Sequence, residues 1–135
     1  MSYPITDIEG IDGDTARILK SVGIRSTDAL LAAARTVKGR KNLAEKTGIA
    51  EKQWLCWANV ADRMRVKGVS KGYAALLQQA GVDTVKDLKY RNPYNLAKAM
   101  ADANEARKLV EFLPSEKLIG RWIEHAKKLP PMISY

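Results

Sequence analysis

The residues best suited to chemistry surround a glycine-containing turn near the middle of the chain. This turn holds Gly68 and Gly72, and basic side chains gather on it and beside it. A tight glycine turn can direct backbone N–H groups outward beside the positive end of the next helix, where a phosphate group fits. With the amides around Val69 open to an anionic oxygen, we expect a phosphate-binding surface made of Arg63, Arg65, Lys67, Gly68, Val69, Ser70, Lys71 and Gly72.

Residues that could support catalysis or metal binding are sparse. His125 is the only histidine and Cys56 the only cysteine, so the chain has no His/Cys cluster with zinc-ligand spacing. It also has no glycine-rich nucleotide-binding loop, and Asp12 and Asp14 are interpreted as charges at the start of a helix. We therefore expect no enzyme activity, no metal, no cofactor and no small-molecule substrate, and we expect His125 to be structural.

The charge balance favours polyanionic partners. The 135 residues include 23 Lys and Arg and 15 Asp and Glu, which gives a net charge of +8. Residues 1–65 carry 11 basic and 8 acidic residues, and residues 66–135 carry 12 and 7. No apolar run reaches the roughly 18 residues of a membrane span, and no export signal is visible. With its single cysteine, expected to be buried between two tryptophans, the sequence indicates a cytoplasmic protein without membrane contact.

One internal repeat organises the chain. The stretch Ile8-Glu9-Gly10-Ile11 recurs 58 residues later as Val66-Lys67-Gly68-Val69, and further matching positions follow each copy. These pairs are Ala16 and Ala74, Leu19 and Leu77, Gly23 and Gly81, and Ile24 and Val82. Such a repeat predicts two similar units, residues 1–65 and 66–135, packed into one compact globule.

The elements that position the turns are helices. Apolar residues recur at helical spacing and strand alternation is absent, which predicts an all-α fold of about nine short helices. Capping residues mark the expected helix starts, namely Asp12, Ser26 or Thr27, Ser70, Thr84 and Asn92. Glycines 23, 48 and 81 mark helix ends, and Leu113-Pro114-Ser115 precedes a final helix that reaches about Leu129.

Both turns resemble the hairpin of the helix-hairpin-helix family. The pattern is hydrophobic-x-Gly-hydrophobic with alanine, leucine and glycine at fixed offsets, although Asp12 and Ser70 stand in place of its second glycine. Residues 80–88 are also similar to the C-terminal domain of bacterial RNA polymerase alpha subunits. As a whole, the chain resembles a bacterial family of tandem helix-hairpin-helix proteins catalogued as a domain of unknown function. This resemblance implies sequence-non-specific contact with the phosphates of DNA, or of RNA.

The two hairpins differ in charge, and this difference separates their expected roles. Asp7, Glu9, Asp12 and Asp14 crowd the first hairpin, where an Asp12 carboxylate that caps the helix would occupy the phosphate site. The second hairpin is basic and is the one expected to bind nucleic acid. The alternative is a protein–protein interaction or assembly module that uses the same helices and has no nucleic-acid role.

Other basic and aromatic residues have plainer interpretations. The cluster at residues 38–41 is interpreted as a solvated helix start, although it could flank a nucleic-acid path. Trp54, Trp57 and Trp122 are expected to be core anchors. Tyr73 follows Gly72, and two placements remain open for it: packed inward or beside a bound strand.

Overall fold

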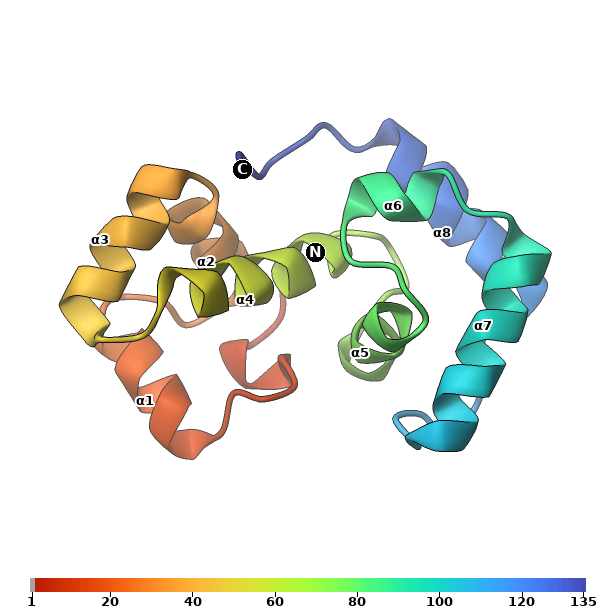
Figure 1. Ribbon diagram of the computed structural model, residues 1–135, viewed down its shortest axis with the longest axis horizontal. Helices are drawn as coiled ribbons and strands as arrows, with labels where there is room; N and C mark the ends of the chain where they lie inside the picture. The colour runs from red at the N-terminus through yellow and green to blue at the C-terminus, as the bar shows by residue number, and fades with distance from the viewer. Residues whose placement is uncertain (1) are drawn as a thin grey trace.

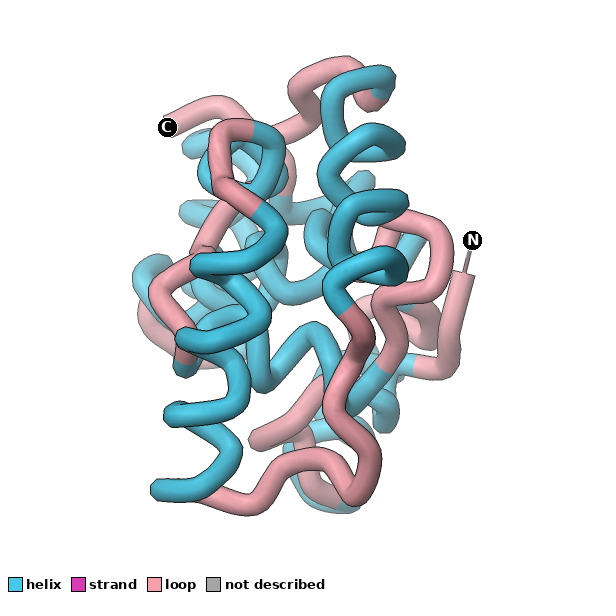
Figure 2. Tube along the Cα trace, turned by 90° about the vertical axis from the view of Figure 1, so that its right-hand side faces the viewer, coloured by secondary structure: helices cyan, strands magenta, loops and turns pink. Residues whose placement is uncertain are grey.

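The chain folds into helices joined by short loops. The computed structural model describes residues 2–135, and within this range it contains no strand, only an isolated bridge between Pro4 and Ser26 (Figures 1 and 2). The all-helical prediction and the expected number of helices are confirmed. The helices are η1 (Ile5–Asp7), α1 (Gly13–Ser21), α2 (Thr27–Ala34), α3 (Val37–Thr47), α4 (Glu51–Arg63), α5 (Lys71–Gln79), α6 (Val85–Lys89), α7 (Pro93–Ala106) and α8 (Glu116–Lys128). No helix of residues 2–135 has the length and apolar character needed to cross a bilayer.

Local signals set most helix ends. The side chains of Asp12, Ser26, Thr84 and Asn92 each accept a hydrogen bond from the backbone N–H three residues ahead. Glycines 23, 48 and 81 have positive φ at the ends of α1, α3 and α5, as predicted. Ser70 is the exception, because its side chain makes no capping hydrogen bond to α5. The prediction that Ser70 caps this helix is therefore wrong.

The 58-residue repeat is visible in the backbone. Gly10 and Gly68 both have φ of +92°. The turn hydrogen bond from Ile11 N–H to Ile8 O, 3.2 Å long, matches the bond from Val69 N–H to Val66 O, 3.0 Å long. The same correspondence holds where α1 and α5 end: Ile24 N–H donates to Leu19 O at 3.0 Å, and Val82 N–H donates to Leu77 O at 2.9 Å. The two sequence copies therefore adopt one local structure.

The helices form two groups that share one buried core. Helices α2, α3 and α4 pack together, while α5 packs on α7, and α6 and α7 pack on α8; α4 also contacts α5 and joins the groups (Figure 1). Trp54, Trp57 and Trp122 are all buried, which confirms their expected role as core anchors. The rings of Trp54 and Trp57 meet edge to face with centroids 5.2 Å apart. Cys56 is exposed, contrary to prediction, because it points away from the helix side that carries Trp54 and Trp57.

The C-terminal segment after α8 returns to the first group of helices (Figure 1). Ser134 N–H donates to Arg35 O at 2.7 Å, and the Tyr135 hydroxyl donates to Asn59 Oδ1 at 2.8 Å. Arg40 is buried beneath this segment, where its guanidinium donates to Ala34 O and Ser134 O at 2.8 and 2.6 Å. The expectation that all of residues 38–41 form a solvated helix start is thus wrong for Arg40.

Candidate nucleic-acid interface

The second hairpin is packed against α8. Lys67 N–H donates to His125 Nδ1 at 2.9 Å, so this histidine has the structural role expected from the sequence. A Cβ atom at Gly68 would lie 3.0 Å from Trp122 Nε1, and Leu118 also borders the glycine. The turn therefore approaches α8 so closely that only glycine fits without displacing the indole ring.

Two hairpin amides are already hydrogen-bonded inside the protein. Lys67 N–H is bonded to His125, and Val69 N–H is bonded to Val66 O. The side chain of Val69 is buried as well. The expectation of open amides around Val69 is therefore wrong for these two groups. The first turn of α5, which follows directly, has no side-chain cap.

Arg63 lies inside the protein and not on the hairpin surface. Its side chain has no exposed area, and it donates to Ala74 O at 3.2 Å and Asp83 O at 2.7 Å. Burial lowers the pKa of its guanidinium, an effect that the Asp83 carboxylate 3.6 Å away opposes. Arg63 therefore fixes α4 to α5 and to the loop before α6, and it must be removed from the predicted set of phosphate contacts.

Arg65 is also engaged within the protein. Its guanidinium donates to Asp62 Oδ1 at 2.7 Å and to Pro130 O at 3.1 Å. Burial raises the pKa of the Asp62 carboxyl, and the charges of Arg65 and Arg63 oppose that rise. Of the predicted basic residues, Lys67 and Lys71 are the two whose side chains are exposed at the hairpin. Gly68 is exposed too, Ser70 is half-buried, and Gly72 packs against Val110.

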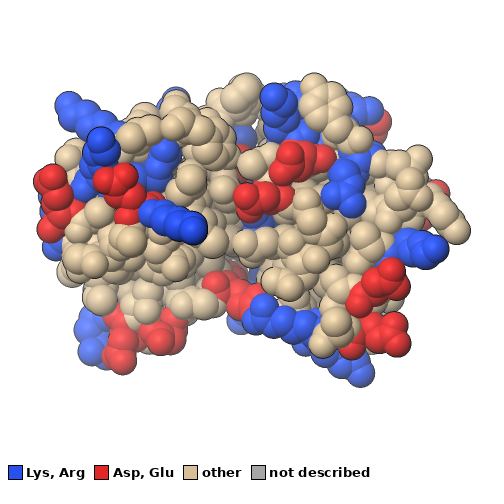
Figure 3. Space-filling model, in the orientation of Figure 1, with Lys and Arg blue, Asp and Glu red and all other residues tan. Residues whose placement is uncertain are grey.

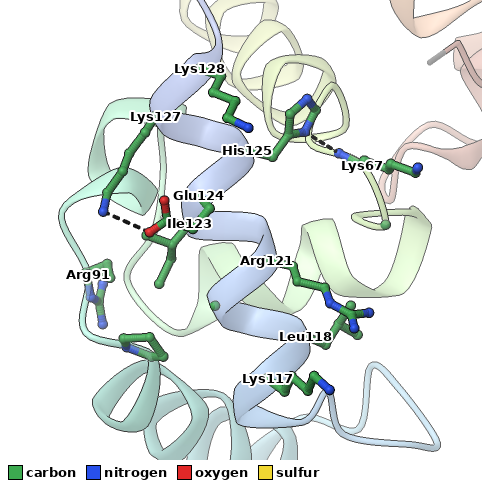
Figure 4. A pocket seen from close by; sticks show the side chains of 13 residues that line it. Lys67, Arg91, Lys117, Leu118, Arg121, Ile123, Glu124, His125, Lys127 and Lys128 are labelled. Carbon is green, nitrogen blue, oxygen red and sulfur yellow. Dashed lines mark hydrogen bonds and ion pairs between the residues drawn. The ribbon is translucent and has the colours of Figure 1, made fainter.

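A basic groove follows α8 beside this hairpin (Figure 4). It has a volume of about 850 Å³, and Arg91 lines it on one side of α8 while Lys67 lines it on the other. Glu124 is the one carboxylate in the lining, and it pairs with Lys127 at 3.1 Å. We name the following six side chains the α8 basic face: Lys67, Arg91, Lys117, Arg121, Lys127 and Lys128. Apart from Lys127, none of them forms an ion pair within residues 2–135.

The amphipathic sequence of α8 builds this face. Ile119, Trp122, Ile123 and Ala126 are buried at spacings of three, one and three residues, which places them on one side of the helix. Lys117, Arg121 and Lys128 recur at spacings of four and seven residues and are exposed. Ser115 caps the helix through Leu118 N–H at 3.0 Å. These α8 residues were not among those predicted from the sequence, and the signal that marks them is the helical period of residues 116–128, which separates the basic residues from the apolar ones.

In the first hairpin, Asp12 caps α1 as its sequence position predicts. The Asp12 carboxylate accepts a hydrogen bond from Thr15 N–H at 2.8 Å, and this bond lowers the pKa of Asp12. Glu9 forms an ion pair with Arg107, which stands just beyond the end of α7. A carboxylate thus occupies the position that an anion would need at the start of α1.

A second, smaller hollow lies between α6 and the segment after α8, and its charged lining residues are Arg65, Lys86, Lys89 and Asp62. On the face drawn in Figure 3, basic and acidic side chains are interspersed over both groups of helices.

Tyr73 packs inward: its ring centroid lies 5.2 Å from that of Trp122, and its hydroxyl donates to Phe112 O at 3.1 Å. Of its two open placements, the inward one is correct. No set of three His, Cys, Asp or Glu side chains within residues 2–135 is arranged to hold a metal ion.

Comparison with known proteins places this helical chain in a family. The profile of the family DUF4332, described as a domain of unknown function, matches residues 9–129. The chain belongs to this family. No curated protein matches the chain, and no solved structure matches it either.

Proposed function

We propose that this protein binds nucleic acid without catalysis, through contact between backbone phosphates and the α8 basic face. The observation that carries the proposal is the groove beside α8, with six Lys or Arg side chains and one carboxylate in its lining. Side chains held on one rigid helix keep their mutual spacing, so their charges act on one ligand together. The proposal extends to α8 the role that the sequence suggested for the second hairpin, and it keeps Lys67 and Lys71 as contacts.

The dimensions of α8 suit a phosphate backbone. Lys117 and Lys128 are separated by 11 residues, which corresponds to about 16 Å along a helix. Phosphates of one DNA strand follow each other at about 3.4 Å along the duplex axis, so the helix spans roughly five nucleotides. Contacts of this kind do not read base sequence, and the proposed binding is therefore sequence-non-specific. In architecture, we propose two tandem helix-hairpin-helix units, a proposal supported by the matching geometry of the turns at Gly10 and Gly68.

A pair of charge-reversal variants tests this assignment. We expect the double change Lys117→Glu and Arg121→Glu to weaken binding of labelled duplex DNA at least about tenfold, because two cations become anions within the groove. The change Lys67→Glu with Lys71→Glu should act in the same direction. The matched control is Lys38→Glu with Lys41→Glu, which alters two exposed lysines of α3 by the same charge.

Fluorescence anisotropy measures the affinities, and circular dichroism verifies that each variant keeps its helices. The control variant should bind within about threefold of the unaltered protein, since only long-range, screened electrostatics change. If the control pair at Lys38 and Lys41 weakened binding as much as the pair at Lys117 and Arg121, net charge alone would account for the binding. The α8 basic face would then lose its assignment.

The alternative function, a protein-interaction module, is favoured by one separate observation. Phe112 and Leu113, in the loop before α8, are 75% and 48% exposed. Neighbouring exposed apolar side chains of this size are typical of protein contacts. Two results together would favour this alternative. The protein would fail to bind duplex DNA even at low salt, and it would capture a partner protein that the Phe112→Ser variant does not capture.

A further inference from the structure

Two tyrosines at the corner between α6 and α7 expose their rings to solvent. Tyr90 is 74% exposed at the end of α6, and Tyr94 is 63% exposed in the first turn of α7. Within residues 2–135, neither tyrosine hydroxyl forms a hydrogen bond with another residue. By contrast, Tyr73 packs on Trp122 and Tyr135 bonds to Asn59. The corner therefore presents two aromatic rings that are largely open to solvent.

Cations alternate with these rings along the chain, at Lys89, Arg91 and Lys98. The Lys89 ammonium lies 5.2 Å from the centroid of the Tyr90 ring. Arg91 and Pro93, between the two tyrosines, line the groove of the α8 basic face. Lys98 follows Tyr94 by four residues and is exposed on the same side of α7. Aromatic rings interleaved with Lys and Arg form the usual surface for unpaired nucleotides, because bases stack on the rings while the cations hold the phosphates.

We infer that Tyr90 and Tyr94 stack unpaired bases of a strand whose phosphates lie against the α8 basic face. This inference rests on the proposed function and adds the class of ligand, namely single-stranded nucleic acid or a junction with unpaired nucleotides. In a duplex the bases stack on one another and cannot reach a protein ring without being flipped out. A duplex therefore contacts the basic face alone, whereas a single strand gains the stacking contacts as well.

The test compares aromatic and non-aromatic side chains at the two positions. Labelled oligo(dT), oligo(U) and a duplex are titrated with the unaltered protein and with the variants Tyr90→Ala, Tyr94→Ala, Tyr90→Phe and Tyr94→Phe. Each change to alanine should weaken oligo(dT) binding by about fivefold or more, since base–aromatic stacking is lost. Each change to phenylalanine should retain affinity within about twofold, and duplex binding should stay within about twofold for all four variants. The oligo(U) arm shows whether RNA uses the same rings.

The outcomes separate the two proposals. If the unaltered protein binds neither duplex nor single strand, the proposed function fails. If it binds duplex and the alanine variants bind single strands as tightly as the unaltered protein, the stacking inference alone is overturned. Equal losses for duplex and single strand would also overturn it, because the rings would then not distinguish unpaired bases. Both side chains are exposed, so thermal unfolding curves that match the unaltered protein verify that the variants fold.

Discussion

At the scale of single residues, Gly68 governs how closely the second hairpin meets α8. Its φ of +92° is a conformation that residues with a Cβ rarely adopt, and the added Cβ would also stand 3.0 Å from Trp122 Nε1. Gly10 has the same φ in the first hairpin, yet nothing lies within 4 Å of its Cβ position. Substitutions at the two glycines therefore distinguish the cost of backbone strain alone from the added cost of a steric contact.

We expect Gly10→Ala to lower the free energy of unfolding by roughly 1 to 2 kcal/mol, the cost of a residue held at positive φ. Gly68→Ala should lower it by at least about 1 kcal/mol more, because the buried indole must also move. Urea unfolding curves of the two variants measure the difference. Equal losses would show that the hairpin can move away from α8 without cost.

The sequence showed which basic residues lie near the second hairpin along the chain, but it predicted the exposure of only some of them. Lys67 and Lys71 are exposed as expected, whereas Arg63 is buried and Arg65 is held by Asp62. The difference arises because the guanidinium of Arg63 finds its acceptors 11 and 20 residues further along the chain. Such acceptors are brought together by packing, and a local sequence pattern does not reveal them.

At the scale of elements, helix starts and ends followed from local chemistry. Four of the expected capping residues form their hydrogen bonds because the bond closes within three residues and needs no tertiary contact. The repeat likewise predicted that both turns share one conformation. The capping bond expected of Ser70 does not form, and the local pattern could not show this because serine and aspartate have similar capping preferences.

The uncapped start of α5 gives a prediction with two readouts. Ser70→Asp should raise the free energy of unfolding by about 0.5 to 1 kcal/mol, since its carboxylate can cap α5 as Asp12 caps α1. The same carboxylate should weaken duplex binding several-fold, because it occupies the first turn of α5 beside Lys67 and Lys71. Chemical unfolding and fluorescence anisotropy measure the two effects.

Asp12→Ser is the matched reverse change in the first hairpin. It should lower stability slightly and leave duplex affinity within about twofold, since Glu9, Asp14 and Asp7 still surround that turn. An unchanged duplex affinity in Ser70→Asp would mean that the start of α5 takes no part in binding.

At the scale of the whole molecule, the segment after α8 ties the two groups of helices together. Ser134 bonds to Arg35 and Arg40, and Arg40 is 94 residues away from it along the chain. Tyr135 bonds to Asn59 across 76 residues. Contacts of such sequence separation have no local signal, which explains why Arg40 was expected to be solvated with its neighbours.

Removing residues 130–135 should therefore lower the free energy of unfolding by roughly 2 to 4 kcal/mol, since several hydrogen bonds are lost, two of them donated by arginine side chains. Tyr135→Phe, which deletes the single hydrogen bond to Asn59, should lower it by about 1 kcal/mol. Thermal and urea unfolding measure both changes. A truncated protein as stable as the full chain would show that this segment is not needed to hold the groups together.

Binding of phosphates by the α8 basic face requires duplex affinity to fall as salt concentration rises, because salt competes with the cations of this face. The binding constant is measured by anisotropy between about 50 and 200 mM salt. Five cations of this face are free of ion pairs within residues 2–135. The logarithm of the binding constant should therefore fall against the logarithm of salt concentration with a slope of about −3 to −5. The slope should become shallower by about 2 when Lys117 and Arg121 are replaced by alanine. A slope near zero, or one that these replacements leave unchanged, would contradict the account.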